Sequence, residues 1–154
     1  MAFYYRIVKS QRAATVLDGE GARLAGGRWN PPGVAMAYLS ASRALAALEI
    51  FVHWGRQATE LKWVVASVEI PDRVISTPEF GALPAGWDSL PSSPTSRKFG
   101  ADWAVSLNSL AIALPSAIIP EEKIVLLNVR HPDISKIEIA EIKPFQFDPR
   151  LGGK

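Results

Sequence analysis

The residue best placed for chemistry is Arg28, which stands between a glycine pair and a rigid turn in the segment GGRWNPPG, residues 26–33. Glycine lets the backbone approach a ligand closely, and proline holds a loop still. A guanidinium presented in this way can donate two parallel hydrogen bonds to a phosphate or a carboxylate. The alternative is a structural salt bridge within the turn. Asn30 in the same loop is a secondary candidate for ligand binding.

A second candidate is Glu49, which lies in the middle of an apolar stretch that includes Leu45, Ile50 and Phe51. A carboxylate is rarely found in such surroundings unless it is paired or has a function. The alternative is that Glu49 points to solvent beside the apolar stripe. His53 follows one helical turn later, shares that face, and is a secondary candidate for ligand binding. The dipole of a helix C-terminus also favours a histidine at such a position, so a purely structural role for His53 is open.

Tyr38 and Ser116 complete the candidate set. Tyr38 precedes an expected helix N-terminus, where free amides can hold an anion, but it could equally be a core tyrosine with a bonded hydroxyl. Ser116 follows Pro115 at a kink in an apolar strand pair. A buried serine there can simply have a satisfied hydroxyl.

Two helices and several strands are expected to position these residues. Helical spacing of Leu45, Leu48 and Val52 predicts a helix over 41–54. Similar spacing of Phe99 and Trp103 predicts a second helix over 96–109. Strands are expected over residues 3–8, 34–39, 62–70, 110–119 with a break at Pro115, 123–129 and 136–147. Residues 18–33 and 76–95 are expected to be loops, because both are rich in turn residues.

This pattern predicts an α+β domain that is rich in β-strands, has two main helices, and spans residues 1–154. The long loop over 76–95 suggests a lid or a partner surface. The prolines and the two-residue alternation argue against a doubly wound parallel sheet.

Composition excludes several classes of protein. Apolar residues make up 48% of the 154 residues, which is enough for a real core. The absence of cysteine excludes disulfides, thiolate zinc sites and a cysteine nucleophile, and two histidines argue against a metal site. No apolar run reaches the roughly 20 residues of a membrane span, and no signal peptide is evident, so a cytoplasmic protein is expected.

The charge distribution argues against a nucleic-acid binder. Residues 1–77 carry nine basic and six acidic side chains, or +3, and residues 78–154 carry eight and nine, or −1. No cluster of Lys and Arg stands out, whereas nucleic-acid modules usually show one. Walker, dinucleotide-fingerprint, nucleophile-elbow and zinc-helix motifs are also absent from the sequence.

Four segments of the chain together resemble the RES-domain proteins. These proteins are toxins of bacterial toxin–antitoxin pairs, and the family is named for an Arg, a Glu and a Ser. The resemblance spans most of the chain in the order of the family: GARLAGGRWNPPG (21–33), AYLSASRALAALEIFVH (37–53), LPSAIIPEEKIVLLNVRHPD (114–133) and PFQFDPRL (144–151). The loop at 76–95 matches weakly.

The resemblance implies a fold like that of ADP-ribosyltransferases and an activity on NAD+ as substrate, without a metal. It implies hydrolysis or phosphorolysis of NAD+, or ADP-ribosylation of a protein, and a neutralising antitoxin with an Xre-type DNA-binding domain. A homodimer within the toxin–antitoxin complex is a further expectation. By motif match, the functional residues of the family fall on Arg28, Tyr38, Glu49 and Ser116. A catalytically silent module that only binds a partner is the alternative.

The chemistry of NAD+ cleavage suits these residue types. Breaking the bond between ribose and nicotinamide develops positive charge on the sugar, as in glycoside cleavage. We expect Glu49 to stabilise that charge and Arg28 to grip phosphate or orient the ribose. Tyr38 is expected to stack on the nicotinamide ring, and Ser116 to hydrogen-bond the ribose or the carboxamide.

Overall fold

The structure is a computed structural model that describes residues 2–153. Its strands form a single seven-stranded sheet in the order β4-β5-β6-β2-β1-β3-β7, in which β4 and β5 are parallel and all other neighbours are antiparallel. The strands are β1 (Ala2–Lys9), β2 (Ala37–Ser40), β3 (Trp63–Ile70), β4 (Ile75–Ser76), β5 (Ala111–Pro115), β6 (Lys123–Leu127) and β7 (Glu138–Phe145). The predicted α+β class is confirmed.

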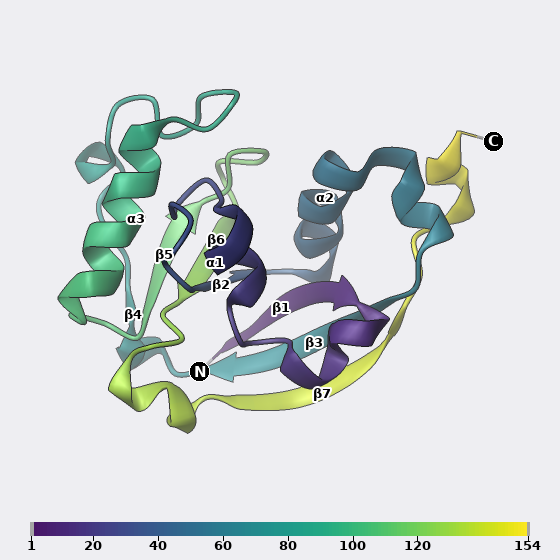
Figure 1. Ribbon diagram of the computed structural model, residues 1–154, viewed down its shortest axis with the longest axis horizontal. Coiled ribbons are helices and arrows are strands. Elements are labelled where there is room, and N and C mark those ends of the chain that lie inside the picture. The colour runs from purple at the N-terminus through teal and green to yellow at the C-terminus, as the bar shows by residue number, and fades with distance from the viewer. Residues whose placement is uncertain (1, 154) are drawn as a thin grey trace.

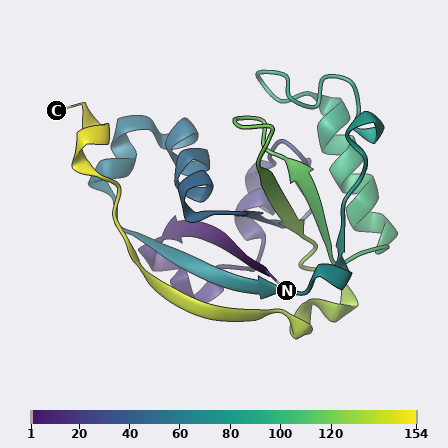
Figure 2. The same cartoon turned by 180° about the vertical axis from the view of Figure 1, so that it is seen from behind.

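Two long helices stand on the same side of the sheet, toward its opposite ends (Figures 1 and 2). They are α2 (Arg43–Trp54) and α3 (Pro94–Ser106), which correspond to the two main helices that were expected. α2 begins where the Ser42 hydroxyl accepts a hydrogen bond from the Leu45 amide at 3.0 Å, which satisfies one of the free amides of the first turn. It ends at Gly55, whose φ of 58° lies in the left-handed region.

The prediction of a helix-free loop over 18–33 is wrong, because a short helix, α1 (Glu20–Ala25), lies within it. Glycine is what allows this helix at such a place: Gly19 and Gly26 flank it, with φ of 70° and 74°. Glu20 and Arg23 add an ion pair one turn apart, with Oε2 and Nε 2.6 Å from each other. α3 also differs from the prediction, since it ends at Ser106 and Leu107 adopts a left-handed backbone.

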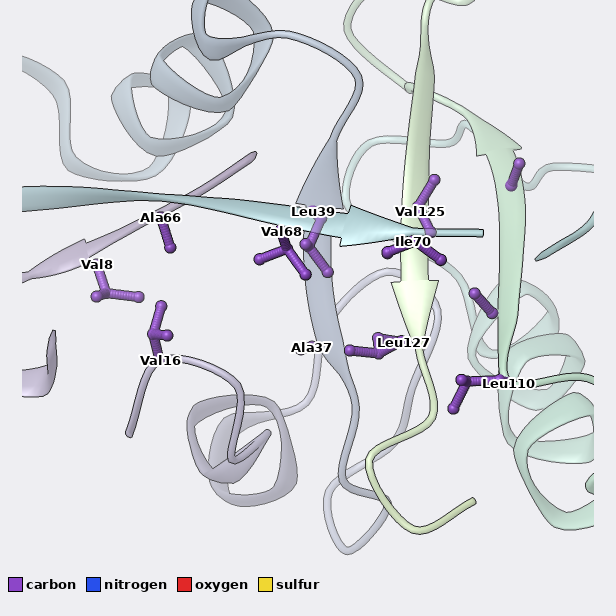
Figure 3. Close-up of a cluster of buried hydrophobic side chains, with 12 residues drawn as sticks. Val8, Val16, Ala37, Leu39, Ala66, Val68, Ile70, Leu110, Val125 and Leu127 are labelled. Carbon is purple, nitrogen blue, oxygen red and sulfur yellow. The ribbon is translucent and has the colours of Figure 1, made fainter. Parts of the chain in front are cut away.

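The sheet is strongly bent, so that β3 runs across β2 and β6 (Figure 3). Side chains from both parts of the sheet meet in the space between these strands. The cluster consists of Val8, Val16, Ala37, Leu39, Ala66, Val68, Ile70, Leu110, Ala111, Ala113, Val125 and Leu127. Burial of this much apolar surface is the main force that holds the two parts of the sheet together.

Two further clusters attach the helices to the opposite face. One of them joins Leu45 of α2, Trp29 of the Arg28 loop, Trp103 of α3 and Leu114 of β5. The other packs Ala46, Ile50 and Phe51 of α2 against β3 and Phe147. The buried face of α2 therefore differs from the one that the spacing of Leu45, Leu48 and Val52 predicted. Val52, for example, is 57% exposed. No helix within residues 2–153 has the length and apolar character needed to cross a membrane.

Candidate active site

The carboxylate of Glu49, a residue of the candidate site, lies on the middle of α2. Its Oε1 atom accepts a hydrogen bond from the Ser116 hydroxyl at 3.0 Å. Glu49 is half-buried and Ser116 is fully buried. The sequence analysis placed both residues in the site, and the structure brings them into direct contact across 67 positions of the chain. The alternative of a Glu49 side chain free in solvent does not hold.

Ser116 is fixed by the turn that joins β5 to β6. The Ser116 hydroxyl oxygen accepts hydrogen bonds from the amides of Ile118 and Ile119, at 3.0 and 3.2 Å. The Ser116 amide donates to the carbonyl of Glu122 at 2.9 Å. A hydroxyl has one proton and two acceptor lone pairs. All three are therefore used here, and the single proton goes to Glu49.

Burial raises the pKa of Glu49 above its ordinary value, because it disfavours the charged form. The hydrogen bond from Ser116 lowers that pKa, and so do the positive charges of His53 and Arg28. His53 is exposed near the C-terminal end of α2, one turn beyond Glu49. The charge of Arg28 thus acts on Glu49, with a smaller effect than burial, Ser116 or His53.

The Arg28 guanidinium is held by main-chain carbonyls and not by the salt bridge that the sequence left open. Its Nη1 atom donates to the carbonyls of Trp87 and Ser89, both at 2.9 Å. Between residues 2 and 153, no carboxylate forms an ion pair with it. The carbonyl of Arg28 in turn accepts from the Ser96 hydroxyl at 2.7 Å. The loop over 76–95 and the start of α3 therefore both determine where Arg28 lies.

Tyr38 and Asn30 form a buried network that gives the Arg28 loop its shape. The Tyr38 hydroxyl donates to Oδ1 of Asn30 at 2.7 Å and accepts from the amide of Trp29 at 2.9 Å. Burial raises the pKa of the Tyr38 hydroxyl, so it stays protonated and able to donate. Gly27 passes so close that a Cβ atom there would lie 2.8 Å from this hydroxyl.

Asn30 is fully buried, and its amide nitrogen donates to the carbonyls of Ala22, Pro31 and Val34 at 2.8 to 3.1 Å. Both of its amide hydrogens therefore serve the loop. The structure places Asn30 behind the site as a support for Arg28, where the sequence suggested a ligand contact.

Sequence reasoning missed Trp87 and Ser96, which hold Arg28. Neither residue belongs to a motif, and the contacts join positions 59 and 68 residues apart. A tryptophan in a loop of Pro, Ser and Gly was the only signal. That indole is 7% exposed and stacks on Trp29, with ring centroids 6.0 Å apart and planes at 20°.

Two cavities lie away from these residues. One, of about 240 Å³, is bordered by residues that include Tyr5, Arg43 and Ser67, and the other, of about 300 Å³, lies beside Val105 and Asn128. None of the predicted site residues borders either cavity. Within the part of the chain that the structure describes, no group of three His, Asp or Glu side chains could hold a metal ion.

Comparison with known proteins shows where this arrangement belongs. The RES domain family matches residues 3–148. The chain is 39% identical to the "Prs ADP-ribosylating toxin" of Sphingobium sp. strain YBL2, over 96% of this chain and 95% of that protein. It is 37% identical to "Toxin Res" of Yersinia enterocolitica, over 96% and 97% of the two chains.

A solved structure has the same fold. It is that of the M. tuberculosis MbcT–MbcA toxin–antitoxin complex, with a TM-score of 0.69 and 18% sequence identity, and the match covers 99% of this chain and 87% of that one. The family match spans the segments that hold Arg28, Tyr38, Glu49 and Ser116. The chain therefore belongs to the RES domain family.

Proposed function

We propose that this protein is a bacterial toxin that cleaves NAD+ at the bond between nicotinamide and ribose. The observation that carries the proposal is the partly buried hydrogen bond between Ser116 and Glu49, on whose carboxylate the charge of Arg28 also acts. Relatives named as an ADP-ribosylating toxin and as Toxin Res support it.

Glu49 supplies negative charge where the reaction develops positive charge. Nicotinamide leaves as a neutral ring, so the reaction needs an anion near the sugar more than it needs a strong acid. A charge pair about 4 Å apart is worth up to ~4 kcal/mol at an effective dielectric of ~20. If that energy stabilises only the transition state, it raises the rate of cleavage roughly a thousandfold.

Ser116 acts on Glu49 and not on the ribose. Its single proton is given to Oε1, and two amides occupy its lone pairs. We therefore assign Ser116 as a positioning residue that fixes the carboxylate. This assignment replaces the direct contact with ribose or carboxamide that the family resemblance suggested.

Arg28 and Tyr38 bind the substrate in this proposal. A guanidinium is suited to the pyrophosphate because of its planar set of donors. The hydroxyl of Tyr38 is used within the protein, so its contribution to binding is the face of the ring against nicotinamide. His53 is exposed one turn from Glu49, at the edge of the candidate site.

The experiment is to incubate the purified chain with NAD+, with and without inorganic phosphate, and to identify the products by mass spectrometry. Free ADP-ribose indicates hydrolysis, its 1″-phosphate indicates phosphorolysis, and a modified protein indicates transfer. Val52→Ala, at an exposed position of α2, is the matched control and should stay active. If NAD+ is unchanged both with and without phosphate and no protein is modified, only the alternative of a partner-binding module remains.

The partner in this proposal is an antitoxin, which the solved complex with the same fold supports. We infer an Xre-type protein that covers the site, and a toxin homodimer within the complex. Co-expression with the product of the adjacent gene tests this directly: a true antitoxin co-purifies with the chain and restores growth.

A further inference from the structure

The loop between β4 and α3, residues 77–93, contacts the Arg28 loop through the side chain of Trp87 and through two main-chain carbonyls. It runs beside α3 on the side of the sheet that also carries α2 (Figures 1 and 2). The carbonyls of Trp87 and Ser89 both accept hydrogen bonds from Nη1 of Arg28, at 2.9 Å each. Two acceptors account for both hydrogens of that nitrogen.

Trp87 contributes more than its carbonyl to this contact. Its indole stacks on Trp29, the residue next to Arg28, and Trp29 also meets Phe99 of α3 edge to face at 5.7 Å. Phe80 closes the outer side of Trp87, with ring centroids 5.8 Å apart and planes at 88°. Such aromatic pairs are worth about 0.5–1.5 kcal/mol beyond the area they bury. Trp87 is thus attached to the Arg28–Trp29 pair by both its backbone and its ring.

This attachment fixes the orientation of the guanidinium. The group is planar, so holding one of its terminal nitrogens with two acceptors sets the direction of the other donors. Nε and Nη2 have no hydrogen-bond partner within residues 2–153. They are the atoms that are left to bind a phosphate or a ribose oxygen.

We propose that Trp87 is a positioning residue for Arg28: its stacked indole and its carbonyl hold the guanidinium so that Nε and Nη2 are presented to the substrate beside Glu49. The proposal rests on the proposed function, since it concerns how the same site binds NAD+. It gives the long loop a defined role, because the conformation of residues 84–90 sets the geometry of the arginine.

A double-mutant cycle tests the proposal. Trp87→Ala should lower kcat/KM for NAD+ about 10- to 100-fold, because a displacement of about 1 Å at a reacting group costs that much. In the Arg28→Ala background the same substitution should have no further effect, since the group that it positions is gone. Trp87→Phe keeps a ring on Trp29 and should restore most of the activity. Leu90→Ala, at an 86% exposed position of the same loop, is the matched control and should change nothing.

Two further readouts separate positioning from loss of structure. The acid limb of the pH profile should move to higher pH in both Trp87→Ala and Arg28→Ala, because the charge of Arg28 lowers the pKa of Glu49. The other groups at Glu49, His53 and Ser116, are unchanged in these variants. The guanidinium NMR signals of Arg28, identified by their loss in Arg28→Lys, should exchange faster with water in Trp87→Ala than in the wild type or Leu90→Ala.

Equal losses from Trp87→Ala in the two backgrounds, or unchanged guanidinium exchange, would overturn the proposal. If Trp87→Ala does not fold, Trp87→Leu replaces it in the cycle, because it keeps a buried apolar side chain without the ring. The NMR readout needs no substrate. A wild type that leaves NAD+ intact would therefore contradict the proposed function alone.

Discussion

Ser116 donates its only hydroxyl proton to Oε1 of Glu49 across 3.0 Å, which links the end of β5 to the middle of α2. Two amides of the following turn hold the serine oxygen, at 3.0 and 3.2 Å. The carboxylate is therefore fixed by a rigid turn of the sheet, although it lies on a helix. A fixed anion costs no reorganisation when charge develops on a substrate, which is the condition for strong electrostatic catalysis.

Ser116→Ala should impair the reaction through Glu49. Loss of the hydrogen bond raises the pKa of Glu49 further, so the acid limb of the kcat/KM profile should move to higher pH. The partly buried amides of Ile118 and Ile119 also lose their acceptor, which costs about 1–3 kcal/mol of stability. Ser135→Ala, at an exposed serine in the 3-10 helix Pro132–Lys136, is the control for both measurements. An unshifted pH profile would show that Ser116 does not act on the carboxylate.

Glu49→Gln should make the protein more stable at neutral pH and no more stable in acid. The raised pKa means that the native state binds the Glu49 proton more tightly than the unfolded chain does. Stability then falls as pH rises from the ordinary pKa of glutamate, about 4.3, through the raised value. Glutamine is uncharged, so its burial does not carry the cost of burying a carboxylate, and its side-chain oxygen can still accept the hydrogen bond from Ser116.

Thermal unfolding of Glu49→Gln and wild type at pH 7 and below pH 4 measures this difference. Glu49→Gln should melt at a higher temperature than the wild type at pH 7, and this difference in melting temperature should become smaller in acid. Glu60→Gln, at an exposed position, is the control and should not show this change. A lower melting temperature of Glu49→Gln at pH 7 would mean that attraction to Arg28 outweighs the cost of burial.

Sequence patterns pointed to those residues of the candidate site that local motifs mark, and missed the residues that contact them from distant parts of the chain. Glu49 stands out because a carboxylate interrupts an apolar helix, and Arg28 because prolines and glycines flank it. The contact of Arg28 with Trp87 spans 59 positions and depends on how α3 packs, so no spacing rule reveals it. The helix over 20–25 was hidden because glycines at its ends are typical of a loop as well as of helix termini.

Tyr38→Phe and Tyr38→Ala should separate support of the loop from contact with the substrate. Phenylalanine leaves the buried Asn30 Oδ1 and the Trp29 amide without their partner, at about 1–3 kcal/mol each. The melting temperature of Tyr38→Phe should therefore fall below that of the wild type. Its turnover of NAD+ at 20 °C should stay within a few-fold of the wild-type value, because the face of the ring remains. Alanine should lose turnover as well. Equal turnover of the two variants would exclude a stacking role for the ring.

Gly100→Ala should disrupt the packing of α3 on the Arg28 loop. A Cβ atom at this position would lie 1.7 Å from the carbonyl oxygen of Trp29, so the helix and the loop cannot both keep their places. Overpacking of this kind typically costs about 1–3 kcal/mol, and occasionally more. Chemical denaturation measures the loss, and Val105→Ala, at a 77% exposed position of α3, is the control. Wild-type stability of Gly100→Ala would contradict this packing.

The rate at which the purified protein consumes NAD+, compared between wild type and Glu49→Gln, tests the central proposal most directly. The wild type should release nicotinamide, and Glu49→Gln should do so more slowly by about two to three powers of ten while remaining folded. Equal rates for two folded proteins, or no nicotinamide release by the wild type, would contradict the proposal that Glu49 drives cleavage of NAD+.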